Sequence, residues 1–235
     1  MTPVSDARRG EILAGLATAS GRIRSAEAAA SRPEGSVGLV VITKTFPAAE
    51  VGVLADLGVR HVGENRDQEA SVKAELLADR NLVWHYVGQL QTNKVRSVVR
   101  YASVVESVDR PRLVQGLSRA AESIDRVVNC LIQVSLDEQP GRGGAEPSDV
   151  PALAEAIVAS PALSLGGVMA VAPLGADPDE AFERLALVAA DVRRDHPDAS
   201  VISAGMSADL EAAVRHGATH VRLGSAILGY RPVVG

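Results

Sequence analysis

Short continuous runs of apolar residues recur along the chain, and a segment with helical spacing of its apolar positions follows most of them. The runs show little alternation between polar and apolar residues, which is typical of parallel strands that are buried on both faces. They predict eight strands, at residues 38–43, 59–63, 84–88, 103–107, 127–134, 165–171, 199–203 and 220–223.

The segments between these runs are predicted to be helices. In residues 48–57, for example, Val51, Leu54 and Ala55 fall on one helical face, and Gly217 is a good stop signal after the last such segment. A further helix precedes the first strand and is expected either to pack on the outside of the fold or to cover its bottom. The predicted helices are residues 6–29, 48–57, 66–78, 110–121, 179–194 and 208–216.

Strands that alternate with helices indicate βα units and a parallel sheet. Eight such units in about 200 residues fit a (β/α)8 barrel, for which about 250 residues are typical. An open doubly wound sheet is the alternative, but the first turn, TKTFPAAE, lacks the GxGxxG pattern of that fold. No linker divides the chain, so we expect one domain over residues 1–235, with the barrel at about 37–231.

Composition narrows the class of protein. Hydrophobic residues make up 46% of the 235 residues and aromatic residues only 3%, so small aliphatic side chains must fill the core. The net charge is −5, from 24 basic and 29 acidic residues, which argues against nucleic acid as a partner. The single cysteine, Cys130, lies in the apolar run VVNCLIQV and is expected to be a buried hydrophobic residue.

The expected location is the cytoplasm. One cysteine cannot form a disulfide within the chain, which fits a reducing compartment. The first residues, MTPVSDARRGEI, are polar and charged, unlike a signal peptide. No apolar run approaches the roughly 18 residues of a membrane span, so no membrane partner is expected.

Two turns rich in small residues follow the last two predicted strands. Barrels of this class carry their active sites at the carboxyl ends of the strands and often hold phosphate after strands seven and eight. The turns SAGMS and RLGSA lie at these positions, and Ser203, Ser207 and Ser225 add hydroxyl donors. Each turn by itself is explained by ordinary turn chemistry. Two of them in adjacent units favour a phosphate pocket, where backbone N–H groups approach an anion closely.

A lysine ends the first predicted strand, in the sequence VITKTFP. Lysine is rarely buried unless it is paired, and a lysine amine can form a Schiff base with a carbonyl compound. A lysine and a phosphate pocket at one barrel mouth therefore indicate a phosphorylated aldehyde or ketone as ligand. The alternative is structural: Lys44 reaches solvent or pairs with Glu64.

Two other polar residues have open interpretations. Arg222 lies between Val221 and Leu223, so its side chain points either into the barrel as a fixed cation or outward as an ion-pair residue. His85 either lines the mouth or has a hydrogen-bonded structural role. None of the five histidines shows metal-ligand spacing, so no metal site is predicted.

Several blocks of sequence together resemble one known family. The blocks VITKTFP, HVGENRDQE, WHYVGQLQTNK, GVMAV and ISAGMSADLEAAVRHGATHVRLGSAILG are similar to those of the pyridoxal phosphate homeostasis proteins, relatives of the barrel domain of alanine racemase. The resemblance covers about residues 8–231. It implies a barrel that binds pyridoxal 5′-phosphate (PLP) in intracellular PLP homeostasis.

The resemblance also implies roles for individual residues. The family lysine that holds PLP as a Schiff base corresponds to Lys44, and the asparagine of the GEN motif, near the cofactor, corresponds to Asn65. Arg222 corresponds to the arginine that faces the pyridine nitrogen. The phosphate-binding residues correspond to Ser203, Gly205, Met206, Ser207, Gly224 and Ser225.

The chain departs from the family pattern at three positions. Phe46 stands where many members carry a second lysine, Arg66 replaces the tyrosine that commonly follows GEN, and Arg142 replaces the lysine of the long loop. Phe46 cannot take over a role of the second lysine in holding or transferring the cofactor, and Arg142 keeps the charge of the loop lysine but cannot form a Schiff base. Neither Lys44 nor the phosphate turns are affected.

Three functions are compatible with these residues. The resemblance implies a non-catalytic carrier or buffer of PLP, with PLP-dependent apoenzymes as possible recipients and a monomeric state. A PLP-dependent amino-acid racemase with weak activity is the alternative, although no β-rich second domain follows to supply the other acid–base group. A Schiff-base aldolase without cofactor would use the same lysine and phosphate turns. We expect the carrier, with no catalytic residue.

Overall fold

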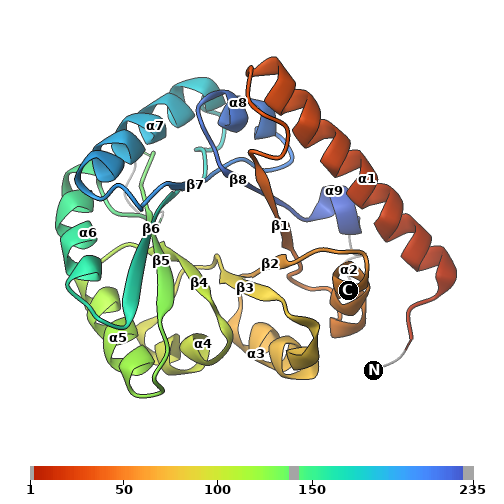
Figure 1. Cartoon of the computed structure of the whole chain (residues 1–235), viewed down its shortest axis with the longest axis horizontal. Helices are drawn as coiled ribbons and strands as arrows, with labels where there is room; N and C mark the ends of the chain where they lie inside the picture. Colours follow the sequence, from red (N-terminus) through yellow and green to blue (C-terminus); the bar gives the residue numbers. More distant parts are fainter. Residues whose placement is uncertain (1–2, 138–142, 230–235) are drawn as a thin grey trace.

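The chain folds into a closed barrel of parallel strands inside a ring of helices (Figure 1). The computed structural model describes residues 3–137 and 143–229. Neighbouring strands pair in chain order and β1 closes the barrel against β8, which confirms the (β/α)8 prediction and excludes the open sheet. The strands are β1 Gly38–Ile42, β2 His61–Glu64, β3 Val83–Tyr86, β4 Val104–Val108, β5 Val128–Gln133, β6 Leu163–Met169, β7 Val201–Ser203 and β8 His220–Leu223.

The helices cover the outer face of the barrel, and most of them occupy segments with helical periodicity in the sequence. The prediction missed α4, α6 and α9, which are short: α4 has 7 residues and α9 only 4. The α-helices are α1 Asp6–Ala29, α2 Ala48–Asp56, α3 Asp67–Leu76, α4 Val95–Tyr101, α5 Pro111–Glu122, α6 Val150–Val158, α7 Pro178–Asp195, α8 Leu210–Arg215 and α9 Ser225–Leu228. Single 3-10 turns span Ala78–Arg80, Thr92–Lys94 and Pro147–Asp149.

Helix α1 lies along the outside of the barrel beside α8, α9 and α2 (Figure 1), so the first of its two predicted placements is correct. Ser5 caps its start, because the serine side chain accepts a hydrogen bond from the Arg8 amide. Gly15 allows a close approach to α9, since a Cβ at this position would lie 2.5 Å from the carbonyl oxygen of Ile227. The helix thus braces the segment that follows β8.

Arginine side chains extend this bracing to the turns of the barrel mouth. Arg8 donates to the carbonyl oxygen of Leu228 at 2.8 Å, at the end of α9. Arg22 donates to the carbonyl oxygen of Ser207 at 2.7 Å and to the carboxylate of Glu211 at 2.6 Å. Helix α1 therefore holds the turn after β7 and the end of α9 from outside.

Apolar side chains fill the layer between strands and helices, with Leu54, Leu117, Phe182 and Leu210 fully or almost fully buried. Cys130 belongs to this layer as predicted, and burial raises the pKa of its thiol to about 12. Within residues 3–137 and 143–229, no helix is long and apolar enough to cross a membrane.

Candidate functional site

Lys44 lies at the carboxyl end of β1, where the chain turns out of the barrel. The turn is closed by a hydrogen bond from the Phe46 amide to the Thr43 carbonyl oxygen at 3.1 Å, and Thr45 has a φ of 69°. The Lys44 side chain is exposed at this position, whereas Thr43 and Phe46 are buried. Lys44 therefore reaches solvent.

Strand register places two other predicted residues beside this lysine. Ile42 pairs with Gly63 of β2, so Asn65 is level with Lys44 on one side. On the other side Val41 pairs with Leu223 of β8, after which Gly224 and Ser225 begin the turn into α9. The structure thus brings the predicted amine, the amide and one phosphate turn together at the mouth.

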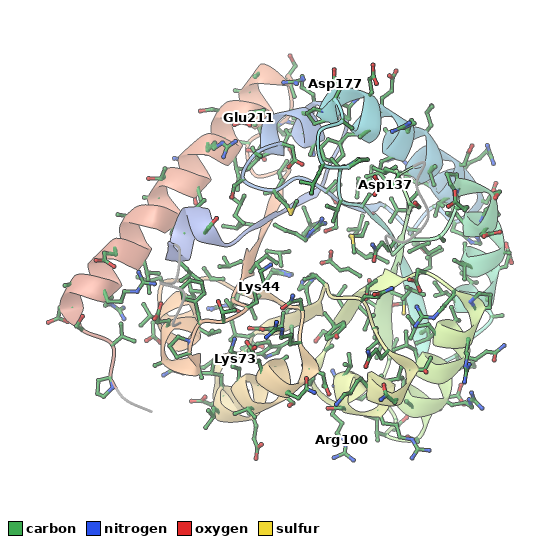
Figure 2. All side chains as sticks on the ribbon, turned by 180° about the vertical axis from the view of Figure 1, so that it is seen from behind. Lys44, Lys73, Arg100, Asp137, Asp177 and Glu211 are labelled. Carbon is green, nitrogen blue, oxygen red and sulfur yellow. The ribbon has the colours of Figure 1, made fainter. Side chains whose placement is uncertain are left out.

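Glu64 does not pair with Lys44, as the structural interpretation of the sequence proposed, but with another lysine. The side chain of Lys73 in α3 is buried, and its ammonium group lies 2.6 Å from Glu64 Oε1 and 2.9 Å from the carbonyl oxygen of Thr43. Thr43 Oγ1 also donates to Glu64 at 2.6 Å. In Figure 2, Lys44 lies by the ring of strands, while Lys73 lies between the ring and α3.

This buried ion pair fixes the backbone immediately before Lys44. Burial raises the pKa of the Glu64 carboxyl group, and hydrogen bonds from Lys73 and Thr43 oppose that shift. Sequence reasoning missed Lys73 as part of the site. The signal was its position in α3 between Ala70 and Ala74, on the face that packs against the barrel.

Asn65 follows Glu64 and is held by close backbone packing. A Cβ at Gly88 would lie 2.3 Å from the carbonyl oxygen of Asn65, so only glycine fits beside it. The hydroxyl group of Tyr86 lies 3.5 Å from the same oxygen. The side-chain oxygen Oδ1 of Asn65 is buried and has no hydrogen-bond partner among the described residues. Such an unsatisfied acceptor indicates a missing donor.

The turn after β7 is built on a glycine that other residues could replace only with strain. Gly205 has a φ of 93°, and a Cβ there would lie 2.7 Å from the Cβ of Ala213 in α8. Its carbonyl oxygen accepts from the amide of Arg222 at 2.9 Å, which ties the turn to β8. Met206 is exposed and Ser207 half-buried at the tip of the turn. Within this turn the Met206 amide donates to the carboxylate of Asp209.

The turn after β8 approaches the end of β1 equally closely. A Cβ at Gly224 would lie 3.0 Å from the carbonyl oxygen of Ile42, two residues before Lys44. Ser225, which is half-buried, starts α9, and the first N–H groups of a helix have no partner within it. This turn is therefore the predicted donor set that lies nearest the lysine.

The side chain of Arg222 points into the barrel, so the first of its two interpretations, a fixed cation inside the barrel, is the correct one. Its guanidinium group is buried and donates to the carbonyl oxygen of Ser203 at 2.7 Å, to Ser203 Oγ at 2.8 Å and to the carbonyl oxygen of Ala170 at 2.7 Å. Burial lowers the pKa of this group, and Glu106 opposes the shift. Ser203 donates its own proton to Glu106 at 2.6 Å, so it is not a free donor for phosphate.

His85 has the structural role that the sequence left open. It is buried inside the barrel, and its Nδ1 lies 2.6 Å from Glu106 Oε1. Glu106, a second residue missed by sequence reasoning, was visible as the charged position in the apolar strand VVESV. Of the family departures, Phe46 is buried and Arg66 exposed, whereas Arg142 lies outside the described residues. Within those residues, no cluster of three or more His, Cys, Asp or Glu side chains could hold a metal ion.

Known proteins of one kind match this chain over nearly its full length. The family model for the N-terminal domain of alanine racemase matches residues 21–232. A pyridoxal phosphate homeostasis protein from Mycobacterium leprae is 42% identical over 240 residues, which cover 94% of this chain and 93% of that protein. A relative of the same name from Pseudomonas aeruginosa is 40% identical and covers 92% of this chain and 94% of its own.

Solved structures agree with these matches. An unknown protein from Bifidobacterium adolescentis superposes with a TM-score of 0.91 at 32% identity, over 95% of this chain and 97% of that one. PipY from Synechococcus elongatus, solved with PLP bound, superposes with a TM-score of 0.79 at 32% identity, over 93% of this chain and all of its own (100%). Alanine racemase from Corynebacterium glutamicum, at 16% identity and a TM-score of 0.68, shows the shared fold alone.

Proposed function

Because the chain belongs to the family of pyridoxal phosphate homeostasis proteins, we propose that it binds PLP covalently through Lys44 and serves as an intracellular carrier or buffer of this cofactor. The observation that carries the proposal is the exposed amine of Lys44, held at the barrel mouth between Asn65 and the turn at Gly224. A cytoplasmic location, a monomeric state and apoenzymes as recipients belong to the same proposal.

The residues at the mouth fit a phosphorylated aldehyde of this size and charge. Gly205 and Gly224 allow two adjacent turns to pack closely against neighbouring segments, since a Cβ at either would collide with or crowd them. Ser207 and Ser225 add hydroxyl groups to those turns, and the unsatisfied Oδ1 of Asn65 is an acceptor for a ligand donor. In this proposal the amine of Lys44 meets the aldehyde of PLP, the cation of Arg222 faces its ring, and the turns at Gly205 and Gly224 meet its phosphate group.

When bound, PLP supplies an aldehyde that condenses with a primary amine and a ring that can withdraw electrons. Lys44 provides the amine. Its exposure favours exchange with amines from solution and works against rapid chemistry, which needs water to be excluded. The buried Lys73–Glu64 pair holds the Thr43 carbonyl group and so positions Lys44 without offering a second free amine.

Arg222 disfavours chemistry that needs a strongly electron-withdrawing ring, such as transamination. A guanidinium group stays protonated in proteins, so it neither gives its proton up to a ring nitrogen nor accepts a proton from it. Three of its five N–H groups donate to Ser203 and Ala170, which fixes it inside the barrel. A ring nitrogen beside such a cation stays unprotonated and withdraws electrons weakly. Weak amino-acid racemisation is the competing activity, and the experiment below measures it.

The test is an absorption titration of the purified protein with PLP, followed by borohydride reduction and peptide mapping. Wild-type protein and Lys44→Ala are compared, and racemisation of amino acids is measured on the same preparations. We expect a visible band in wild-type protein, a reduced adduct on Lys44, neither in Lys44→Ala, and no turnover. Clear racemisation with the adduct on Lys44 would make the protein an enzyme. No band and no adduct would overturn the cofactor proposal.

A further inference from the structure

A continuous series of polar side chains runs through the interior of the barrel below the mouth. Arg222 on β8 donates to Ser203 Oγ on β7 at 2.8 Å, and Ser203 Oγ donates to Glu106 Oε2 on β4 at 2.6 Å. The other oxygen of Glu106 contacts His85 Nδ1 on β3 at 2.6 Å, and His85 Nε2 contacts His61 Nδ1 on β2 at 2.9 Å. Five strands thus share one hydrogen-bonded series.

This composition is unusual for the centre of a barrel, which branched aliphatic side chains normally fill. Glu106 is completely buried, with a relative exposure of 0%, and an unpaired carboxylate at such a place would be very unfavourable. Each of its oxygens has a partner, and the guanidinium group of Arg222 lies 3.7 Å from Oε2. Burial raises the pKa of the Glu106 carboxyl group, but His85 and Arg222 outweigh burial and leave this pKa below its ordinary value.

Glu106 therefore determines how Ser203 is oriented, and through Ser203 how Arg222 is held. A serine hydroxyl group has one proton. Because Ser203 gives that proton to Glu106, its lone pairs face Arg222 and accept from it. Without the carboxylate, the hydroxyl group can rotate, and the buried guanidinium group loses its nearest negative charge.

We propose that Glu106 is a positioning residue, which acts through Ser203 and by its charge to hold Arg222 in a fixed place facing the cofactor ring. The proposal rests on the proposed function, because it assigns to Arg222 the place beside the ring. The His85–His61 pair holds the far oxygen of Glu106 and stops the carboxylate from turning away.

Three substitutions separate charge, shape and general stability. Glu106→Gln keeps the shape and removes the charge, whereas Glu106→Asp keeps the charge. Glu27→Gln is the matched control, because Glu27 is equally buried but binds the backbone amides of Gly35 and Val37 beyond the C-terminal end of α1, outside the barrel.

The first readout needs no cofactor. Hydrogen exchange of the Arg222 guanidinium protons, followed by NMR with labelled arginine, reports how firmly this group is held. We expect exchange to be at least about ten-fold faster in Glu106→Gln than in wild-type protein, and unchanged in Glu27→Gln, because a ten-fold change corresponds to about 1.4 kcal/mol, the size of one charge-assisted contact. Unchanged exchange in Glu106→Gln would overturn the proposal.

The second readout is the Kd and absorption maximum of bound PLP. We expect Glu106→Gln to raise the Kd by about ten-fold and to shift the absorption maximum, with Glu106→Asp within about three-fold of wild type. If Glu106→Gln does not fold, Ser203→Ala removes the hydroxyl bridge and is expected to speed the exchange of Arg222; normal exchange in that variant would contradict the proposal. If wild-type protein binds no PLP while Arg222 exchange responds as expected, the proposed function fails and the positioning of Arg222 by Glu106 stands.

Discussion

The two halves of the barrel mouth are built by different physical means. The half formed by β7 and β8 consists of backbone turns and small residues, such as Gly205 and Gly224, at which any Cβ would crowd a neighbour. The half formed by β1, β2 and α3 depends on a buried ion pair, Lys73 with Glu64, beneath an exposed Lys44. The first half is organised by shape and the second by charge.

The difference teaches which changes each half tolerates. A backbone turn built on glycine loses its form when a side chain is added. A buried ion pair fails when one partner is removed, because the other charge then remains without compensation. The predictions below therefore set removal of charge in one half against addition of volume in the other.

Removal of the Lys73 ammonium group is expected to have the largest effect. Lys73→Met leaves Glu64 buried without its partner and should lower the free energy of unfolding by about 3–5 kcal/mol. Because burial raises the pKa of Glu64, the deficit should shrink as the pH falls and the carboxylate takes up a proton. Urea unfolding at two pH values measures both effects.

Lys44→Met is the matched control for this substitution. Lys44 is exposed, so its replacement should change the free energy of unfolding by less than about 0.5 kcal/mol. If Lys73→Met proves as stable as Lys44→Met, the second half of the mouth is not organised by buried charge.

Addition of one methyl group at Gly205 is the corresponding test of the first half. Gly205→Ala puts a side chain at a φ of 93° and 2.7 Å from Ala213 Cβ, which should lower the free energy of unfolding by about 1–3 kcal/mol. The changed turn should also weaken PLP binding. Thermal unfolding and a binding titration measure the two losses.

Gly217→Ala separates backbone strain from the collision. Gly217 has nearly the same φ, 92°, but its nearest neighbour, Ile202 Cδ1, would lie 3.8 Å from a Cβ. We expect this variant to lose stability only through strain and to bind PLP normally. Equal loss of PLP binding in both variants would show that the turn at Gly205 has no special part in the site.

A third polar set, beneath both halves, predicts how stability depends on pH. Burial lowers the pKa of His61 and of His220, and the neighbouring histidines lower them further, while Glu106 opposes the shift. The pKa values of these histidines are lower in the folded than in the unfolded state, where the value is about 6.5. Below that pH the unfolded chain therefore binds more protons than the folded chain, and the free energy of unfolding is expected to fall as the pH falls.

Replacement of one histidine isolates this effect. His61 faces His85, His220 and Glu106 inside the barrel. His61→Phe removes one titrating group, so the loss of unfolding free energy between pH 7 and pH 5 should be smaller than in wild-type protein. Chemical unfolding across this range tests it, and an unchanged slope would contradict the assignment.

The smallest expected effect concerns a single hydroxyl group in the first half. Ser225→Ala removes one donor from the turn after β8 and leaves its backbone groups in place. The Kd for PLP should rise by about ten-fold, as expected for one hydrogen bond of about 1.4 kcal/mol, with little change in stability. Ser118→Ala, on the outer helix α5, should bind PLP as wild type does. A normal Kd for Ser225→Ala would show that the hydroxyl group does not contribute to PLP binding and that this turn acts only through its backbone N–H groups.

The same contrast explains what could be predicted from the sequence. Strands and turns are local, so the barrel and the two glycine turns follow from apolar runs and from SAGMS and RLGSA. The direction of the Arg222 side chain could not be predicted from the sequence. Alternation along a strand shows which residues share a face, but not which of the two faces lies inside the barrel. The structure turns this side chain inward, where Ser203 and Ala170 accept its hydrogen bonds.

The buried pairs could not be predicted because they join residues from separate elements. Glu64 was considered as a partner for Lys44, but the packing of α3 against the barrel brings Lys73 to it instead. Glu106 and His85 lie on adjacent strands, and their contact depends on the register of β3 and β4. The available signals were the charge of Glu106 within the apolar run VVESV and the position of Lys73 on the same face of α3 as Ala70 and Ala74.

A crystal structure of the protein after reduction with PLP and borohydride would test the central claim most directly, namely that one ligand joins the two halves of the mouth. The account predicts continuous density from Lys44 Nζ, a phosphate group between the turns at Gly205 and Ser225, and Lys73 still paired with Glu64. An adduct on Lys73, or a phosphate group away from both turns, would contradict it.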